Sequence, residues 1–139
     1  MYALDWLTQR GCSVAPRLIK LIHSVQDGDD MPVPGGWLAF ILMERVPGVP
    51  LTHFHTYNLA KRDKIRKTFR RSVTELYSHH IQPFDHNPAN LIYDENQYKC
   101  YFMDFEHVRI DATKLPPRFY EDLYDLWRLD DKKLGLVGR

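Results

Sequence analysis

Residues 84–106, FDHNPANLIYDENQYKCYFMDFE, contain two short apolar runs separated by a polar turn. Asp85 and Asn90 stand before the first run, and Asp104 follows the second run. The pattern predicts a β-hairpin, which brings the start of its first strand beside the end of its second strand. We therefore expect Asn90 and Asp104 to lie at the same end of the hairpin, with Asp85 on the loop just before it.

These three side chains carry the oxygen atoms that hold Mg²⁺ in proteins, where phosphate oxygens complete the coordination. A surface hairpin whose Asp and Asn residues only begin and end turns would have a similar sequence. For Asp85 and Asn90 alone, the turn interpretation would be preferable. The second aspartate, Asp104, favours a metal–phosphate site because it follows the returning strand.

The composition is that of one folded domain. The chain has 139 residues, of which 44% are hydrophobic, and its net charge of +1 indicates no class of partner. Two cysteines, Cys12 and Cys100, do not make a disulfide framework. No apolar run approaches the length of a membrane span, and residues 1–10 do not have the pattern of a secretory signal. We expect a soluble, intracellular, cytoplasmic protein with no membrane partner.

Outside the hairpin, the sequence predicts helices and one further strand pair. Residues 2–10 predict a short helix, and residues 18–25 and 37–43 predict two antiparallel strands, the second continuously apolar as in a strand buried on both faces. Residues 59–80 predict the longest helix, and residues 119–129 a last amphipathic segment. The expected core residues include Trp37, Phe40, Ile65, Phe69, Val73, Leu76, Phe119, Leu123, Leu126 and Trp127.

Three motifs follow one another along the chain: ILMERVPG (41–48), FDHNPAN (84–90) and MDFE (103–106). The first resembles the strand and hinge between the two lobes of the protein-kinase-like superfamily. The second resembles its catalytic loop, with the spacing D-x-x-x-x-N, and the third resembles its metal-binding D-F-G motif in a D-F-E form. The similarity is to the aminoglycoside- and choline-kinase-like branch, which includes fungal kinase-like domains, and it extends over roughly residues 1–110.

The resemblance implies an α+β, kinase-like fold that forms one domain overall. Residues 1–47 would be an incomplete N-terminal lobe, made of a helix, two or three antiparallel strands and the hinge. Residues 48–139 would be a reduced, mainly helical C-terminal lobe that carries the catalytic hairpin. Since no strands precede the first helix, we expect an exposed sheet edge to which a partner chain would bind.

The resemblance also implies ATP-dependent transfer of a phosphoryl group to a hydroxyl of a small molecule or a protein. Asp85 would be the catalytic base, and Asn90 and Asp104 would hold Mg²⁺ against the ATP phosphates. The backbone carbonyl of Glu44 and the backbone N–H of Val46 would meet the edge of the adenine.

Departures from the family pattern favour an alternative function. The chain has no glycine-rich loop to cover the phosphates and no strand lysine before the first helix. Pro83 and Phe84 replace residues that support the catalytic loop in the family. Because a lost electrostatic contact costs about 3–4 kcal/mol of barrier, the alternative is a catalytically inactive pseudokinase or a protein-interaction module.

Two further patterns have simpler explanations. Residues 61–71, KRDKIRKTFRR, hold seven basic residues and suggest nucleic-acid binding as a further alternative, but a solvated helix face explains them more simply. His53 and His55 lack the thiolates or the helical H-x-x-x-H pair that zinc sites use. We expect His80 to pack or to form hydrogen bonds near the catalytic loop.

Overall fold

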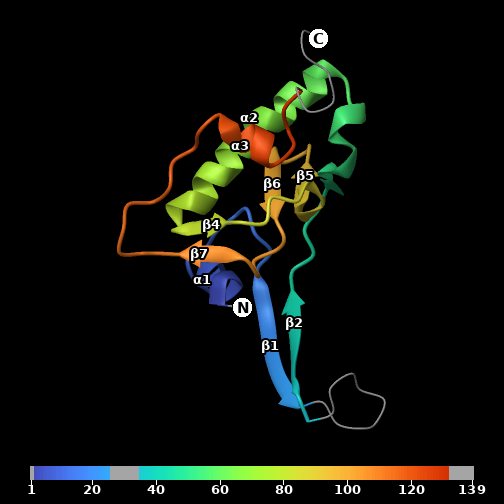
Figure 1. The fold of residues 1–139 in the computed structure, drawn as a ribbon. Helices are drawn as coiled ribbons and strands as arrows, with labels where there is room; N and C mark the ends of the chain where they lie inside the picture. The colour runs from blue at the N-terminus through green and yellow to red at the C-terminus, as the bar shows by residue number, and fades with distance from the viewer. Residues whose placement is uncertain (1, 26–34, 132–139) are drawn as a thin grey trace.

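The computed structural model describes residues 2–25 and 35–131, and this part of the chain is a mixed α+β structure with small antiparallel sheets and few helices. A two-stranded hairpin, β1–β2, extends away from a body in which the remaining sheets lie against the long helix α2 (Figure 1). The elements are α1 (Tyr2–Gln9), β1 (Leu18–Val25), β2 (Trp37–Met43), β3 (Val49–Pro50), the 3-10 helix η1 (Leu51–Thr56), α2 (Leu59–Ser78), β4 (Ile81–Pro83), the 3-10 helix η2 (Pro88–Asn90), β5 (Leu91–Asp94), β6 (Lys99–Phe102), β7 (Val108–Ile110) and α3 (Asp122–Leu126).

The core is built on the apolar face of α2. Asn58 caps the helix, because its side-chain oxygen accepts the Lys61 N–H at 2.9 Å and so satisfies one free amide of the first turn. The helical spacing of the apolar residues is confirmed, since the following four side chains are fully buried: Ile65, Phe69, Val73 and Leu76. Strand β6 lies along this helix, so the core connects α2 directly to the predicted hairpin.

The C-terminal segment covers the far end of this core. Leu123 and Trp127 are buried as expected, and Phe119 packs against the core while partly exposed. The expectation for Leu126 is wrong, because this side chain is 42% exposed. Leu123 and Trp127 are four residues apart and share one face of the short helix, whereas Leu126 lies about 100° around the axis from Trp127.

The β1–β2 pair is confirmed, but its expected burial is wrong. The strands pair antiparallel from Val25 opposite Trp37 to Leu18 opposite Met43. Phe40, expected in the core, is 56% exposed. The apolar run does not pass through a packed body: the two strands extend from it and leave their faces to solvent (Figure 1).

This hairpin has consequences for two other expectations. Within the described residues, its sheet has only two strands, so each strand keeps one unpaired edge, as expected. The side chain of Trp37 lies outside the described part of the structure, and its expected burial stays a prediction.

The basic residues 61–71 lie on α2, and the interpretation as a solvated face is wrong for Arg62, which is 5% exposed. Arg62 Nε donates to Asp131 Oδ1 at 3.0 Å, and Arg62 Nη1 donates to the Tyr57 carbonyl at 2.6 Å. Arg66 reaches the same Asp131 oxygen at 3.1 Å. A buried guanidinium is stable only when it is paired, and these pairs join α2 to the end of the described chain. Arg62 and Arg66 are therefore paired within the structure rather than free on the helix surface.

Among the described residues, no helix combines the length and the apolar character that a membrane crossing requires.

Candidate functional site

Strands β5 and β6 form the predicted hairpin, paired from Leu91 opposite Phe102 to Asp94 opposite Lys99. The pairing is fixed at the turn, where the Asn96 N–H donates to Asp94 Oδ1 at 3.0 Å. The Cys100 N–H donates to Ser72 Oγ of α2 at 2.9 Å, and four side chains bury the hairpin against the core: Leu91, Tyr93, Cys100 and Phe102. The strands that lead to the other end of the hairpin are therefore held in place by buried side chains.

Asn90 and Asp104 meet at that other end, as the sequence predicts. Asn90 Nδ2 lies 3.5 Å from Asp104 Oδ2, and the Met103 N–H donates to the Asn90 carbonyl at 3.0 Å. The Glu106 N–H donates to Asp104 Oδ1 at 3.0 Å. Both side chains are half-buried. One carboxylate oxygen of Asp104 is therefore fixed by the backbone, and the other points to the Asn90 amide.

The loop that carries Asp85 is closed by a second strand pair. β4 pairs antiparallel with β7, with Pro83 opposite Val108. One residue further on, the Phe84 N–H donates to the His107 carbonyl at 2.8 Å. Residues 84–90 and 103–107 are consequently held between two ladders, the β4–β7 pair on one side and the β5–β6 pair on the other. This arrangement supports the loop although Pro83 contributes no side-chain hydrogen bond.

Asp85 is exposed and lies beside an open cavity of about 610 Å³. Phe84, Glu106, His107 and Val108 line this cavity with it. In the part of the chain that the structure describes, Asp85 makes no hydrogen bond or ion pair with the Asn90–Asp104 pair. The structure thus joins two of the three predicted side chains directly and leaves the third on the adjoining loop, open to a small molecule.

Two loop residues have structural roles that the sequence did not predict. The His86 ring packs edge-on against Trp127, with ring centroids 5.2 Å apart. Burial lowers the pKa of His86, although the Asp85 charge opposes this shift. The Asn87 side chain accepts the Ala89 N–H at 3.0 Å and caps η2, the turn that delivers Asn90. No local pattern could reveal the His86–Trp127 contact, because it joins the loop to a distant segment.

The predicted adenine contacts lie at the base of the β1–β2 hairpin. The Glu44 N–H donates to the Arg17 carbonyl at 2.8 Å, which fixes the start of the hinge. Among the described residues, the backbone hydrogen bonds outside the helices and strands do not include the Glu44 carbonyl or the Val46 N–H. Glu44 borders an open cavity of about 540 Å³ that also reaches Tyr101 of β6.

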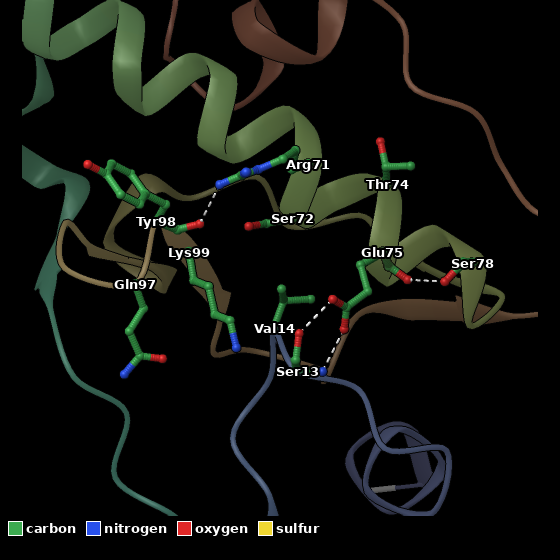
Figure 2. A pocket seen from close by; sticks show the side chains of 10 residues that line it. All are labelled: Ser13, Val14, Arg71, Ser72, Thr74, Glu75, Ser78, Gln97, Tyr98 and Lys99. Carbon is green, nitrogen blue, oxygen red and sulfur yellow. Dashed lines mark hydrogen bonds between the residues drawn. The ribbon is translucent and has the colours of Figure 1, made fainter.

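A further open cavity of about 610 Å³ lies between α2 and the loop after α1 (Figure 2). The Glu75 carboxylate crosses its rim and accepts the Ser13 N–H and the Ser13 hydroxyl, each at 2.6 Å. Burial alone would raise the pKa of Glu75, but these bonds outweigh it and lower the pKa. None of the sequence-predicted site residues lines this cavity.

Three other histidines singled out in the sequence, His53, His55 and His80, lie away from the Asn90–Asp104 pair in the hydrogen-bond network. His53 and His55 lie in η1 rather than in an extended segment, so they do not share a face. His55 Nε2 is 2.9 Å from the Asp130 carbonyl oxygen, within hydrogen-bond distance. His80 follows the end of α2 with a positive φ of 64°, and its carbonyl accepts the Asp111 N–H at 3.3 Å beyond β7.

Neither a scan of protein-family models nor a search of curated proteins gives a match to this chain. The function is therefore inferred from the site itself, where Asn90 and Asp104 meet and Asp85 lies on the adjoining loop.

Proposed function

We propose that this chain is a kinase-like domain whose β5–β6 hairpin binds Mg²⁺ and the phosphates of ATP at its open end. The observation that carries the proposal is the 3.5 Å separation of the Asn90 and Asp104 side chains. Mg²⁺ binds oxygen at about 2.0–2.1 Å in octahedral geometry, so neighbouring ligand oxygens lie about 2.9 Å apart. A flip of the Asn90 amide presents Oδ1 in place of Nδ2, and a shift of well under 1 Å completes the fit.

The order of elements supports the same proposal. The helix α1, the β1–β2 pair, the hinge, the helix α2 and the hairpin follow one another as the resemblance implies. The β4–β7 ladder joins the two ends of the loop segment, so residues from both motifs lie side by side. In this arrangement ATP would extend from the Glu44 carbonyl and Val46 N–H to the hairpin.

Asp85 would accept the proton of an acceptor hydroxyl, and its position on an open cavity gives a small-molecule or protein substrate access to it. These 139 residues contain no glycine-rich loop of the kind that covers the phosphates in the family. Each lost electrostatic contact costs about 3–4 kcal/mol of barrier, or roughly a hundred- to thousandfold in rate. We therefore propose metal-dependent ATP binding with slow transfer, and a chain that binds without any transfer would be a pseudokinase.

Calorimetric titration with ATP, with and without Mg²⁺, tests this function. We expect binding that requires Mg²⁺, and we expect Asp104→Ala to weaken it by more than about tenfold, because loss of groups that merely orient a metal ligand already costs 10–100-fold. Glu95→Ala is the matched control: it removes an exposed carboxylate at the turn end of the same hairpin and should leave the affinity unchanged. Absence of any binding at millimolar ATP in the presence of Mg²⁺ would contradict the proposal.

A further inference from the structure

A second group of side chains of the types that bind metals is formed by Cys12, Glu75 and His79. Of these three, Glu75 lines the cavity of Figure 2. One ligand atom each of Cys12, Glu75 and His79 lies within 4.8 Å of the other two, and all three residues are half-buried. In residues 2–25 and 35–131 this is the one group of three or more Cys, His, Asp or Glu side chains with such spacing. We propose that these residues form a Zn²⁺ site, which is independent of the proposed ATP site.

The fold brings the three residues together from two elements. Glu75 lies in the last turn of α2 and His79, four residues later, caps the C-terminus of the helix, so their side chains lie on the same side. Cys12 follows the end of α1 (Tyr2–Gln9), where Gly11 has a φ of +70°, a backbone conformation that suits glycine. Trp6 Nε1 donates to the His79 carbonyl at 2.7 Å and fastens α1 to the end of α2 beside the group.

The ligand types select zinc among the common divalent ions. A thiolate, an imidazole and a carboxylate all bind Zn²⁺, whereas Mg²⁺ and Ca²⁺ prefer oxygen ligands alone. Zinc bonds of about 2.0–2.3 Å place the ligand atoms of a tetrahedron about 3.3–3.8 Å apart. His79 Nε2 and Glu75 Oε2 are 4.0 Å apart, so small side-chain rotations close the site.

Hydrogen bonds from Ser13 and Val14 already orient two of the proposed ligands, Glu75 and Cys12. The Ser13 N–H and hydroxyl bind the two oxygens of Glu75, and a carboxylate has about four lone-pair positions, so Glu75 can bind an ion and keep both bonds. The Val14 N–H forms a hydrogen bond with the Cys12 sulfur. Such outer partners are a regular part of metal sites.

The charges balance when zinc is bound. Binding replaces the proton of the thiol: Cys12–SH and Zn²⁺ give Cys12–S–Zn⁺ and H⁺. The thiolate and the Glu75 carboxylate then neutralise the ion. The neighbouring cationic groups are Arg10 and His80 beside His79 and Lys99 beside Cys12.

The fourth position of the site faces solvent. Cys12 and Ser13 border the open cavity beside the hinge, and Ser13 and Glu75 border the cavity of Figure 2. A water molecule can therefore complete a tetrahedron with three protein ligands, which is the arrangement of open zinc sites rather than of closed structural ones.

Titration of the chain with Zn²⁺ against a chromophoric chelator, and with Co²⁺ as a spectroscopic probe, tests the proposal. We expect one ion per chain at about micromolar affinity, weaker than four-ligand structural sites, and a sulfur-to-cobalt charge-transfer band. Cys12→Ser should remove that band and weaken Zn²⁺ binding more than about 100-fold, and His79→Ala should also weaken binding strongly. The Cys12→Ser variant still contains Cys100. Metal binding through the Cys100 thiol would therefore persist in this variant and would be visible as a remaining charge-transfer band.

Two controls separate a ligand role from a structural role. His53→Ala removes an exposed histidine and should leave Zn²⁺ affinity unchanged, and Asp104→Ala should do the same because it alters only the proposed ATP site. Circular dichroism of each variant verifies that the fold is retained. Absence of one-to-one Zn²⁺ binding by the natural chain, or a folded Cys12→Ser variant that binds Zn²⁺ as tightly, would overturn the proposal.

Discussion

Replacement of Phe69 by alanine is expected to lower the free energy of unfolding by about 3–5 kcal/mol. Phe69 is fully buried on α2. The centroid of its ring lies 6.2 Å from that of Phe102 in β6 and 6.0 Å from those of Tyr124 and Trp127. Removal of the ring leaves a cavity where α2, the hairpin and the C-terminal segment meet. Denaturant unfolding followed by circular dichroism measures the change.

Phe84→Ala is the matched control, because it removes the same ring from a side chain that is 53% exposed. We expect a loss of under about 1 kcal/mol, since surface substitutions leave no cavity. Equal losses for Phe69→Ala and Phe84→Ala would contradict the assignment of the core to the junction of α2 and the hairpin. The comparison also bears on function, because this core supports the strands that hold Asn90 and Asp104.

Gly48→Ala is expected to lower the free energy of unfolding by about 2–5 kcal/mol, because a left-handed backbone strains a non-glycine residue and a forced backbone shift costs more. Gly48 has a φ of +122°, and a Cβ atom there would lie 2.4 Å from the carbonyl oxygen of Tyr93 in β5. The obstacle is backbone rather than a flexible side chain, so the β3–β5 pairing must move. Thermal and denaturant unfolding measure the loss.

Gly11→Ala is the control for this prediction. Gly11 also has a positive φ, of +70°, but a Cβ atom there meets nothing within 4 Å. We expect the cost of backbone strain alone, about 1–2 kcal/mol. A Gly48→Ala variant no less stable than Gly11→Ala would show that the close approach of residue 48 to β5 is not required by the fold.

The elements were predictable from the sequence where the local pattern alone determines them. The strand pair at 18–25 and 37–43, the long helix and the β5–β6 hairpin all follow from periodicity and turn residues. The meeting of Asn90 and Asp104 was predictable for the same reason, because a hairpin fixes which residues face one another.

Burial was less predictable, because it depends on what lies opposite an element. The apolar run of β2 has the composition of a buried strand, yet Phe40 and Leu42 are more than half exposed because the hairpin extends from the body. Arg62 has the composition of a surface residue, yet Asp131 pairs with it under the C-terminal segment.

The Cys12–Glu75–His79 group could not be predicted from the sequence at all. Glu75 and His79 are one helical turn apart, but the cysteine comes from the other side of the β1–β2 hairpin in the sequence. A metal-ligand spacing can be recognised only when the ligands share a local motif. The packing of α1 against the end of α2 supplies the third ligand, and a tertiary contact of this kind has no local signature.

The measurement that tests the proposed ATP site most directly is paramagnetic broadening of amide NMR signals by Mn²⁺ in the presence of ATP. Mn²⁺ prefers the same oxygen ligands and geometry as Mg²⁺, so it reports where the metal–nucleotide complex lies. We predict ATP-dependent broadening at Asn90, Met103 and Asp104. Sharp signals at the hairpin under saturating ATP and Mn²⁺ would contradict the assignment of this site.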